Sequence, residues 1–280
     1  MSFIQEALIT RFISYNMPSV SIIMGVYNCE DTVEEAVLSI LNQTFQDFEF
    51  IICDDCSADQ TYQILEKLKK IYSDKIILLK NSTNRKLSYT LNKCLSVAKG
   101  KYIARMDADD ISTEDRLQFQ FDFLESNKEF DLIGTGVSVF DSLGERNKII
   151  QKEFPRINDL FFGTVFNHAT IMMNRTKLSS IDNYTDLKHT VRVEDIDLWF
   201  KCFEANIKGF NTKKILYKVR LNPSDLKRRT YQSRVNEFKV RRNGFKINKV
   251  PLILWPLALL PLVKGIVPNK LIYFTHKYIK

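Results

Sequence analysis

The chain has 280 residues, of which 45% are hydrophobic and 26% are charged, and its formal net charge is +8. This composition excludes an intrinsically disordered chain and supports one large hydrophobic core or two smaller ones. The five cysteines are odd in number and scattered, which argues against a disulfide framework and favours a reducing compartment. Residues 1–17 carry interspersed charges and no long apolar run, so we expect no signal peptide there.

The first hundred residues alternate between strand-like and helix-like segments. Short runs rich in β-branched and aromatic residues predict strands, and apolar residues at helical spacing predict helices. The predicted order is strand 19–25, helix 33–41, strand 48–53, helix 64–72, strand 76–79, helix 87–98 and strand 102–106. This alternation predicts an α/β fold with a doubly wound, mostly parallel sheet and helices on both faces.

Three carboxylates, Asp107, Asp109 and Asp110, directly follow the fourth predicted strand. In open α/β sheets, ligands bind beyond the carboxyl ends of the strands. Side chains two apart in extended chain point the same way, so Asp107 and Asp109 face one ligand. Mg²⁺ and Mn²⁺ prefer such oxygen ligands, with one or two carboxylates completed by substrate phosphates. In the alternative interpretation, Ser112 is an N-cap and the acids serve the start of the next helix.

The second predicted strand also ends in acids, Asp54 and Asp55. Neither a G-x-G-x-x-G motif nor a G-x-x-x-x-G-K-[ST] motif is present, which argues against a dinucleotide oxidoreductase and a P-loop enzyme. Phosphate binding without a glycine cradle requires a metal, which agrees with the site at Asp107 and Asp109. The alternative for Asp54 and Asp55 is an Asx turn, with Asp59 capping the next helix.

Five segments resemble, in family order, the inverting family-two glycosyltransferases of GT-A type, and most closely bacterial enzymes that build capsule or lipopolysaccharide. They are VSIIMGVYNCEDTVEEAVLSILNQTF, FIICDDCSADQT, AKGKYIARMDADDISTEDRL, HATIMMN and VEDIDLWFKC. The resemblance covers about residues 19–220. It implies a GT-A domain over residues 1–224, with a nucleotide-binding half at about 19–115 and an acceptor half at about 116–224.

The resemblance implies a donor site for a nucleotide sugar. Gly25, Tyr27 and Asp55 match the positions that hold the nucleotide, and Asp55 is expected to accept the imide hydrogen of uracil. A basic residue before the third helix usually approaches the diphosphate, and Arg85 or Lys86 stands there. The family often has a glycine in this segment, and this chain lacks it.

The resemblance also implies the reacting groups. Asp107-Ala108-Asp109 matches the family's metal-binding Asp-x-Asp, with Asp109 as the expected direct ligand of Mn²⁺ or Mg²⁺, and Asp195 matches the catalytic base. An inverting transfer needs one carboxylate to take the acceptor's hydroxyl proton while the nucleotide leaves from the opposite face. Glu194 is expected beside it on the acceptor side. The alternative for Glu194 and Asp195 is a helix N-terminus that favours acids.

Four further positions are candidates by resemblance. Trp199 and Phe200 are expected to line the acceptor groove, with core packing as the alternative for Phe200. His168 resembles part of a family His-Pro-Ser segment, with a hydrogen-bonded structural histidine as the alternative. Arg220 stands where relatives often carry a histidine; arginine cannot bind a cation as a ligand, so we expect it to pair with the donor diphosphate.

The C-terminal segment, residues 225–280, has a different character. Residues 226–280 hold 13 Lys/Arg and one acidic residue, and residues 250–263 are uncharged and contain three prolines. A membrane-spanning helix needs roughly 20 apolar residues, and an interior proline costs about 3 kcal/mol. We therefore expect a helical extension that associates with an anionic membrane surface without crossing it. In the alternative, this segment packs on the catalytic domain or on a partner chain.

The sequence thus predicts an enzyme, a metal-dependent glycosyltransferase that moves a sugar, expected from a UDP donor, to a hydroxyl of a glycan or lipid-linked acceptor. We expect it in the cytoplasm, on the inner face of the plasma membrane. A catalytically silent binding protein of the same fold is the alternative, although Asp55, Asp107, Asp109 and Asp195 together argue against it. Nucleic-acid binding is not expected, because the apolar neighbour of the basic segment suits lipid better.

Overall fold

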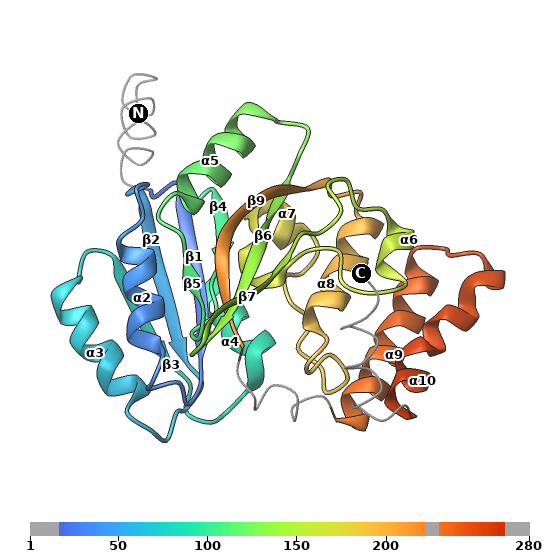
Figure 1. The fold of residues 1–280 in the computed structure, drawn as a ribbon, viewed down its shortest axis with the longest axis horizontal. Coiled ribbons are helices and arrows are strands. Elements are labelled where there is room, and N and C mark those ends of the chain that lie inside the picture. The colour runs from blue at the N-terminus through green and yellow to red at the C-terminus, as the bar shows by residue number, and fades with distance from the viewer. Residues whose placement is uncertain (1–16, 222–229, 267–280) are drawn as a thin grey trace, which may run out of the picture.

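The computed structural model describes residues 17–221 and 230–266. Within them the chain forms one curled, mixed sheet with helices on both faces (Figure 1). The strands are β1 (Val20–Val26), β2 (Phe48–Asp54), β3 (Ile76–Lys80), β4 (Tyr102–Arg105), β5 (Ile111–Ser112), β6 (Leu132–Asp141), β7 (Gly144–Ile149), β8 (Met172–Asn174) and β9 (Gly209–Arg220). The helices are α2 (Val33–Leu41), α3 (Thr61–Ile71), α4 (Lys86–Leu95), α5 (Arg116–Ser126), α6 (Ile157–Leu160), η1 (His168–Thr170), α7 (Arg175–Ser180), α8 (Glu194–Glu204), α9 (Tyr231–Ile247), η3 (Leu252–Leu259) and α10 (Leu260–Ile266).

The sheet order is β3-β2-β1-β4-β8-β6-β9-β5, with β7 paired to β6. The first four strands are parallel to one another, which confirms the predicted α/β fold and its seven alternating elements. β8 joins the sheet antiparallel to both β4 and β6, so the second half of the sheet is mixed. The acids that follow β2 and β4 therefore emerge from the same edge, on either side of β1.

The predicted N-cap at Ser112 is wrong. Ser112 lies in β5, where it pairs with Tyr217 of β9, and its backbone N–H donates to Ser39 Oγ at 3.1 Å. The helix begins only at Arg116, with Asp115 as its N-cap residue. The long-range pairing with β9 outcompeted the local capping motif, so the acids at 107–110 do not serve the start of a helix.

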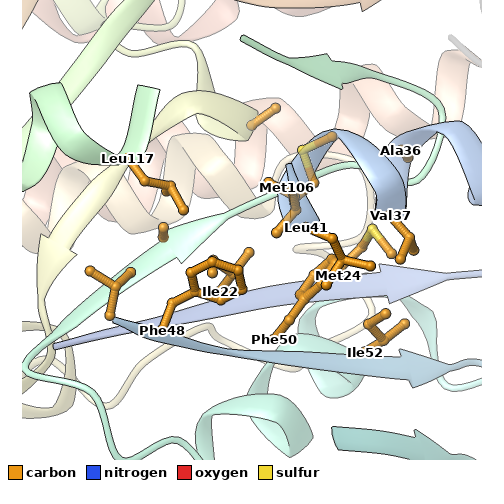
Figure 2. Packing of buried hydrophobic residues seen from close by; sticks show 14 of the residues in the cluster. Ile22, Met24, Ala36, Val37, Leu41, Phe48, Phe50, Ile52, Met106 and Leu117 are labelled. Carbon is orange, nitrogen blue, oxygen red and sulfur yellow. The ribbon is translucent and has the colours of Figure 1, made fainter. Parts of the chain in front are cut away.

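A hydrophobic core lies on each face of the sheet. On one face, Ile22 and Met24 of β1 and Phe50 of β2 pack against Val37 of α2 and Leu117 of α5 (Figure 2). Because side chains alternate along a strand, neighbouring residues such as Ile23 and Ile103 point to the other face. There they join a second core that includes α8 and α9. The sheet is thus buried on both faces, as a doubly wound sheet requires.

The C-terminal helices pack against this second core, at the opposite end of the molecule from α3 (Figure 1). Phe245 of α9 is fully buried, with its ring centroid 4.5 Å from that of Phe161. A Cβ on Gly244 would lie 2.2 Å from the Phe200 ring, so glycine permits the close approach of α9 and α8. The expected domain boundary at residue 224 lies outside the described residues. None of the helices in the described part of the chain has the length and apolarity needed to cross a membrane.

Candidate active site

The Asp-x-Asp segment, Asp107-Ala108-Asp109, follows β4, and the side chain of Arg105 anchors it. The Arg105 guanidinium donates to both oxygens of Asp107, at 2.6 and 3.1 Å. The backbone N–H of Asp107 donates to the hydroxyl of Tyr217, a buried residue of β9, at 3.1 Å. Asp107 is therefore fixed on two sides before any ligand arrives.

Asp109 and Asp110 differ in exposure and partners. Asp110 is buried and its carboxylate accepts the backbone N–H of Arg220 at 2.8 Å. Burial, with the negative charges of Asp107 and Asp109, raises the pKa of Asp110 well above its usual range. Asp110 is thus a structural residue of the loop, whereas Asp107 and Asp109 remain half-buried at its surface.

The oxygen ligands at this loop fit a magnesium or manganese ion of the kind that substrate phosphates complete. Among the described residues no group of three or more His, Cys, Asp or Glu side chains forms a complete metal cage. Mg²⁺ commonly uses one or two carboxylates and takes its remaining ligands from water and phosphate. The carboxylates of Asp109 and Asp107 are oxygen donors of this kind.

The loop after β2 is organised by Asp55. Its carboxylate accepts the backbone N–H groups of Arg85 and Lys86, at 2.7 and 2.8 Å, and the Asn81 amide at 2.8 Å. Asp55 is 5% exposed, so it ties the start of α4 to the end of β2. The contact with uracil stays a prediction. Sequence reasoning missed the structural part of this role, because the partners lie about 30 residues away.

The other donor-side candidates lie around this loop. Tyr27, at the end of β1, is 50% exposed, and the side chains of Arg85 and Lys86 are also exposed. A Cβ on Gly25 would lie 3.1 Å from Thr90 and 3.2 Å from Leu87, so glycine lets α4 lie close over β1. Lys86 has a positive φ of 71°, a conformation that favours glycine. This is the segment where the family often carries one.

Glu194 and Asp195 occupy the first turn of α8, which begins two residues before Ile196, the predicted start of this helix. Both side chains are half-buried. Burial and the charge of Asp195 raise the pKa of Glu194 to about 7. Burial also raises the pKa of Asp195, while a backbone N–H of the helix N-terminus and the positive charge of Arg105 oppose the rise. A half-buried carboxylate with a raised pKa is suited to accept a proton near neutral pH.

Trp199 is part of the core on the α8 face of the sheet. Trp199 is fully buried, its Nε1 donates to Thr164 Oγ1 at 3.1 Å, and its ring packs edge-on to His168. His168 Nε2 lies 2.9 Å from the Tyr184 hydroxyl. Burial and the charge of Arg105 lower the pKa of His168 well below its usual range, so the ring is neutral. The contacts of His168 match its structural alternative, and the expected acceptor-side roles of His168 and Trp199 stay predictions.

Arg220 is held at the edge of the Asp-x-Asp loop. Its Nε donates to the Asp109 carbonyl at 3.0 Å, and its guanidinium forms an ion pair with Glu35 of α2. The guanidinium carbon lies 4.6 Å from the centroid of the Phe140 ring. Arg220 is thus beside the expected metal ligands, although a diphosphate contact would compete with Glu35.

Known proteins resemble this chain in both fold and sequence. The fold is of GT-A type: the chain superposes on the S. aureus TarS 1-349 structure in complex with UDP-GlcNAc with a TM-score of 0.68, over 88% of this chain and 71% of that one, at 20% identity. Among sequence relatives, a Bacillus subtilis protein that carries the name glycosyltransferase EpsE is 39% identical, over 93% of this chain and 94% of its own. The Escherichia coli UDP-Glc:alpha-D-GlcNAc-diphosphoundecaprenol beta-1,3-glucosyltransferase WfaP is 29% identical, over 89% and 96%.

The fold and the acidic edge define a glycosyltransferase. Residues 21–181 match the profile of Glycosyl transferase family 2, and the chain belongs to that family. The family resemblance inferred from the five sequence segments is thereby confirmed.

Proposed function

We propose that the protein is a metal-dependent inverting glycosyltransferase that moves a sugar from a UDP-type donor to a hydroxyl group. The observation that carries this proposal is the position of Asp109, half-buried beside an anchored Asp107 at the carboxyl edge of the sheet. The Asp55 loop lies at the same edge, on the other side of β1. This arrangement gives a nucleotide diphosphate a base-binding end and a metal end.

Each residue has a separate task in this proposal. Asp55 and the exposed Tyr27 receive the nucleoside, and Lys86, Arg85 and Arg220 are the cations near the diphosphate. Asp109, with Asp107, would hold Mn²⁺ or Mg²⁺, which when bound supplies Lewis-acid stabilisation of the leaving nucleotide. Asp195 takes the proton of the attacking hydroxyl, and the sugar is transferred with inversion.

We propose a lipid-linked oligosaccharide of a surface polysaccharide as the acceptor. The support is the activity that the name of WfaP states: this relative is a glucosyltransferase for a diphosphoundecaprenol-linked sugar. Such an acceptor is anchored in a membrane, so the enzyme must work at the membrane surface.

The C-terminal helices carry exposed apolar side chains for that surface: Leu252, Ile253 and Leu259 of η3 and Val263 of α10. Leu252 and Ile253 are 78% and 85% exposed. Five exposed cations lie on the same helices and their connection, at Lys239, Arg242, Lys246, Lys249 and Lys264. Each Lys or Arg near an anionic membrane contributes about 1 kcal/mol, and exposed leucines add apolar burial. Trp255 instead packs on the core, with Nε1 donating to the Val250 carbonyl at 3.1 Å.

Liposome flotation tests whether these exposed apolar residues bind a membrane. Wild type is expected to float with anionic vesicles at low salt, and Leu252→Asn/Ile253→Asn to lose most of that binding. Leu143→Asn, which changes an 81% exposed leucine far from the C-terminal helices in sequence, is the matched control. Equal flotation of all three proteins, or none by the wild type, would contradict the membrane proposal and leave the transferase proposal intact.

The transferase proposal itself is tested by UDP and GDP release from a panel of nucleotide sugars, with Mn²⁺, Mg²⁺ or a chelator. We expect release from at least one donor and its loss with the chelator. A catalytically silent protein of the same fold would bind a donor and release nothing.

A further inference from the structure

The first turn of α2 contacts the Asp-x-Asp loop and its neighbour Arg220. Thr32, the N-cap residue of α2, donates its hydroxyl to the Ala108 carbonyl at 2.9 Å. Glu35, three residues further along, forms the ion pair with Arg220. Residues three apart lie on the same side of a helix, so both contacts come from one face of α2. The proposed function gives Glu35 no task, although its carboxylate pairs with a cation expected at the diphosphate.

Arg220 is held in place by contacts other than the one with Glu35. Its backbone N–H donates to the Asp110 carboxylate at 2.8 Å, and its Nε donates to the Asp109 carbonyl at 3.0 Å. The guanidinium carbon lies 4.6 Å from the centroid of the Phe140 ring, so the flat face of the group is also in contact. Glu35 is therefore not needed to keep Arg220 beside the Asp-x-Asp loop.

The contact with Glu35 instead occupies the charged end of Arg220. Nη2 of the guanidinium donates to Oε2 of Glu35. A guanidinium binds carboxylate and phosphate through the same N–H groups, so the two anions compete for it. The side chain of Glu35 is 55% exposed and that of Arg220 is 26% exposed. An ion pair this open to water is weak, so a phosphate group can replace the carboxylate.

We propose that Glu35 is a positioning residue that competes with the donor diphosphate for Arg220. When the diphosphate binds, the guanidinium exchanges the Glu35 carboxylate for a phosphate oxygen, and it returns to Glu35 when the nucleotide leaves. The inference rests on the proposed function, because it places Arg220 at the diphosphate. The competition lowers the affinity for UDP, which is also the product that must leave after each transfer.

Calorimetry of UDP binding in the presence of Mn²⁺ tests this exchange by comparing two neighbouring acids. Glu35→Gln removes the charge that pairs with Arg220 and keeps the size of the side chain. Glu34→Gln is the matched control, because Glu34 is exposed and lines the same cavity of about 520 Å³ beside α2. Both changes remove one negative charge from the first turn of α2, and they differ in the contact with Arg220.

Glu35→Gln is expected to bind UDP about two- to fivefold more tightly than the wild type, as expected from the strength of an exposed ion pair. Glu34→Gln should bind UDP as the wild type does. In an Arg220→Gln background, the further change Glu35→Gln should no longer tighten binding, because the cation that it releases is missing. A purely structural role of Glu35 would lower the melting temperature without tightening UDP binding.

Equal UDP affinities of the wild type and Glu35→Gln, or weaker binding by Glu35→Gln, would overturn the proposal. Equal tightening by Glu34→Gln, or tightening that persists in the Arg220→Gln background, would also contradict it, because the effect would then be one of general charge. These outcomes leave the transferase proposal intact. Absence of UDP binding by the wild type would contradict the proposed function, and the role of Glu35 with it.

Discussion

The carboxylate of Asp55 accepts the backbone N–H of Lys86 at 2.8 Å, while Lys86 holds a φ of 71°. This contact fixes a left-handed residue at the start of α4. An L-amino acid with a side chain is strained in that conformation, and glycine is not. The strain is tolerated because Asp55 also holds Arg85 and Asn81.

We predict that Lys86→Gly stabilises the protein by about 0.5–1 kcal/mol, since relief of the backbone strain exceeds the entropy lost by glycine on folding. The melting temperature should rise by about 1–3 °C. Lys86→Ala is the control, because it removes the charge and keeps the strain. A glycine variant no more stable than the alanine variant would show that the φ is not strained.

We predict a pH-dependent effect of Glu194→Gln on stability. The pKa of Glu194 is about 7 in the folded protein and about 4.5 when the chain is unfolded. Between these values the unfolded chain has lost the proton and the folded protein keeps it, so this group's contribution to stability falls as pH rises from about 4.5 to 7. Glutamine does not titrate.

The melting temperature of Glu194→Gln relative to wild type should therefore increase by about 2 °C or more between pH 5 and pH 8. Glu204→Gln, at the exposed end of the same helix, is the control and should show no such trend. A constant difference for Glu194→Gln across this range would mean that Glu194 ionises normally.

We predict that Asp109→Asn abolishes metal-dependent UDP binding and leaves the melting temperature unchanged. The carboxylate is half-buried at a loop, and in the proposed function it contributes a metal ligand instead of core packing. Calorimetry with UDP and Mn²⁺ measures the affinity, and Asp122→Asn on the exposed face of α5 serves as the control. Unaltered UDP binding in Asp109→Asn would remove Asp109 from the metal site.

We predict that Asp195→Asn keeps UDP affinity and lowers turnover by about 10² to 10⁴, the range typical of losing a general base. The loss should appear in kcat, because in the proposed function Asp195 does not bind the donor. Near-normal turnover would assign the base to another residue, and Glu194, whose pKa is about 7, would be examined first.

Local sequence patterns predicted much of the fold. Strands such as β2 and β4 were evident because buried strands of a parallel sheet are apolar runs that end in polar residues, and the acids after them mark its ligand edge. Helix boundaries shifted by a few residues, as at Glu194, because acids suit both the last loop residue and the first turn.

The contacts between distant segments were not predictable in this way. Tyr217 bonds to Asp107 across 110 residues, and Ser112 pairs with β9 instead of capping a helix. Trp199 gave an aromatic signal that fits a groove or a core equally well, and only the packing shows that it is fully buried. The local sequence gave one sign that Arg105 has buried partners: it is the last residue of a buried strand.

The central claim is that one base activates a hydroxyl while the nucleotide leaves from the opposite face of the sugar. Time-resolved proton NMR of donor hydrolysis tests it most directly, with an α-linked donor such as UDP-glucose or UDP-N-acetylglucosamine and Mn²⁺. The account predicts that the β-anomer of the sugar appears first and that Asp195→Asn suppresses it. First appearance of the α-anomer would contradict it.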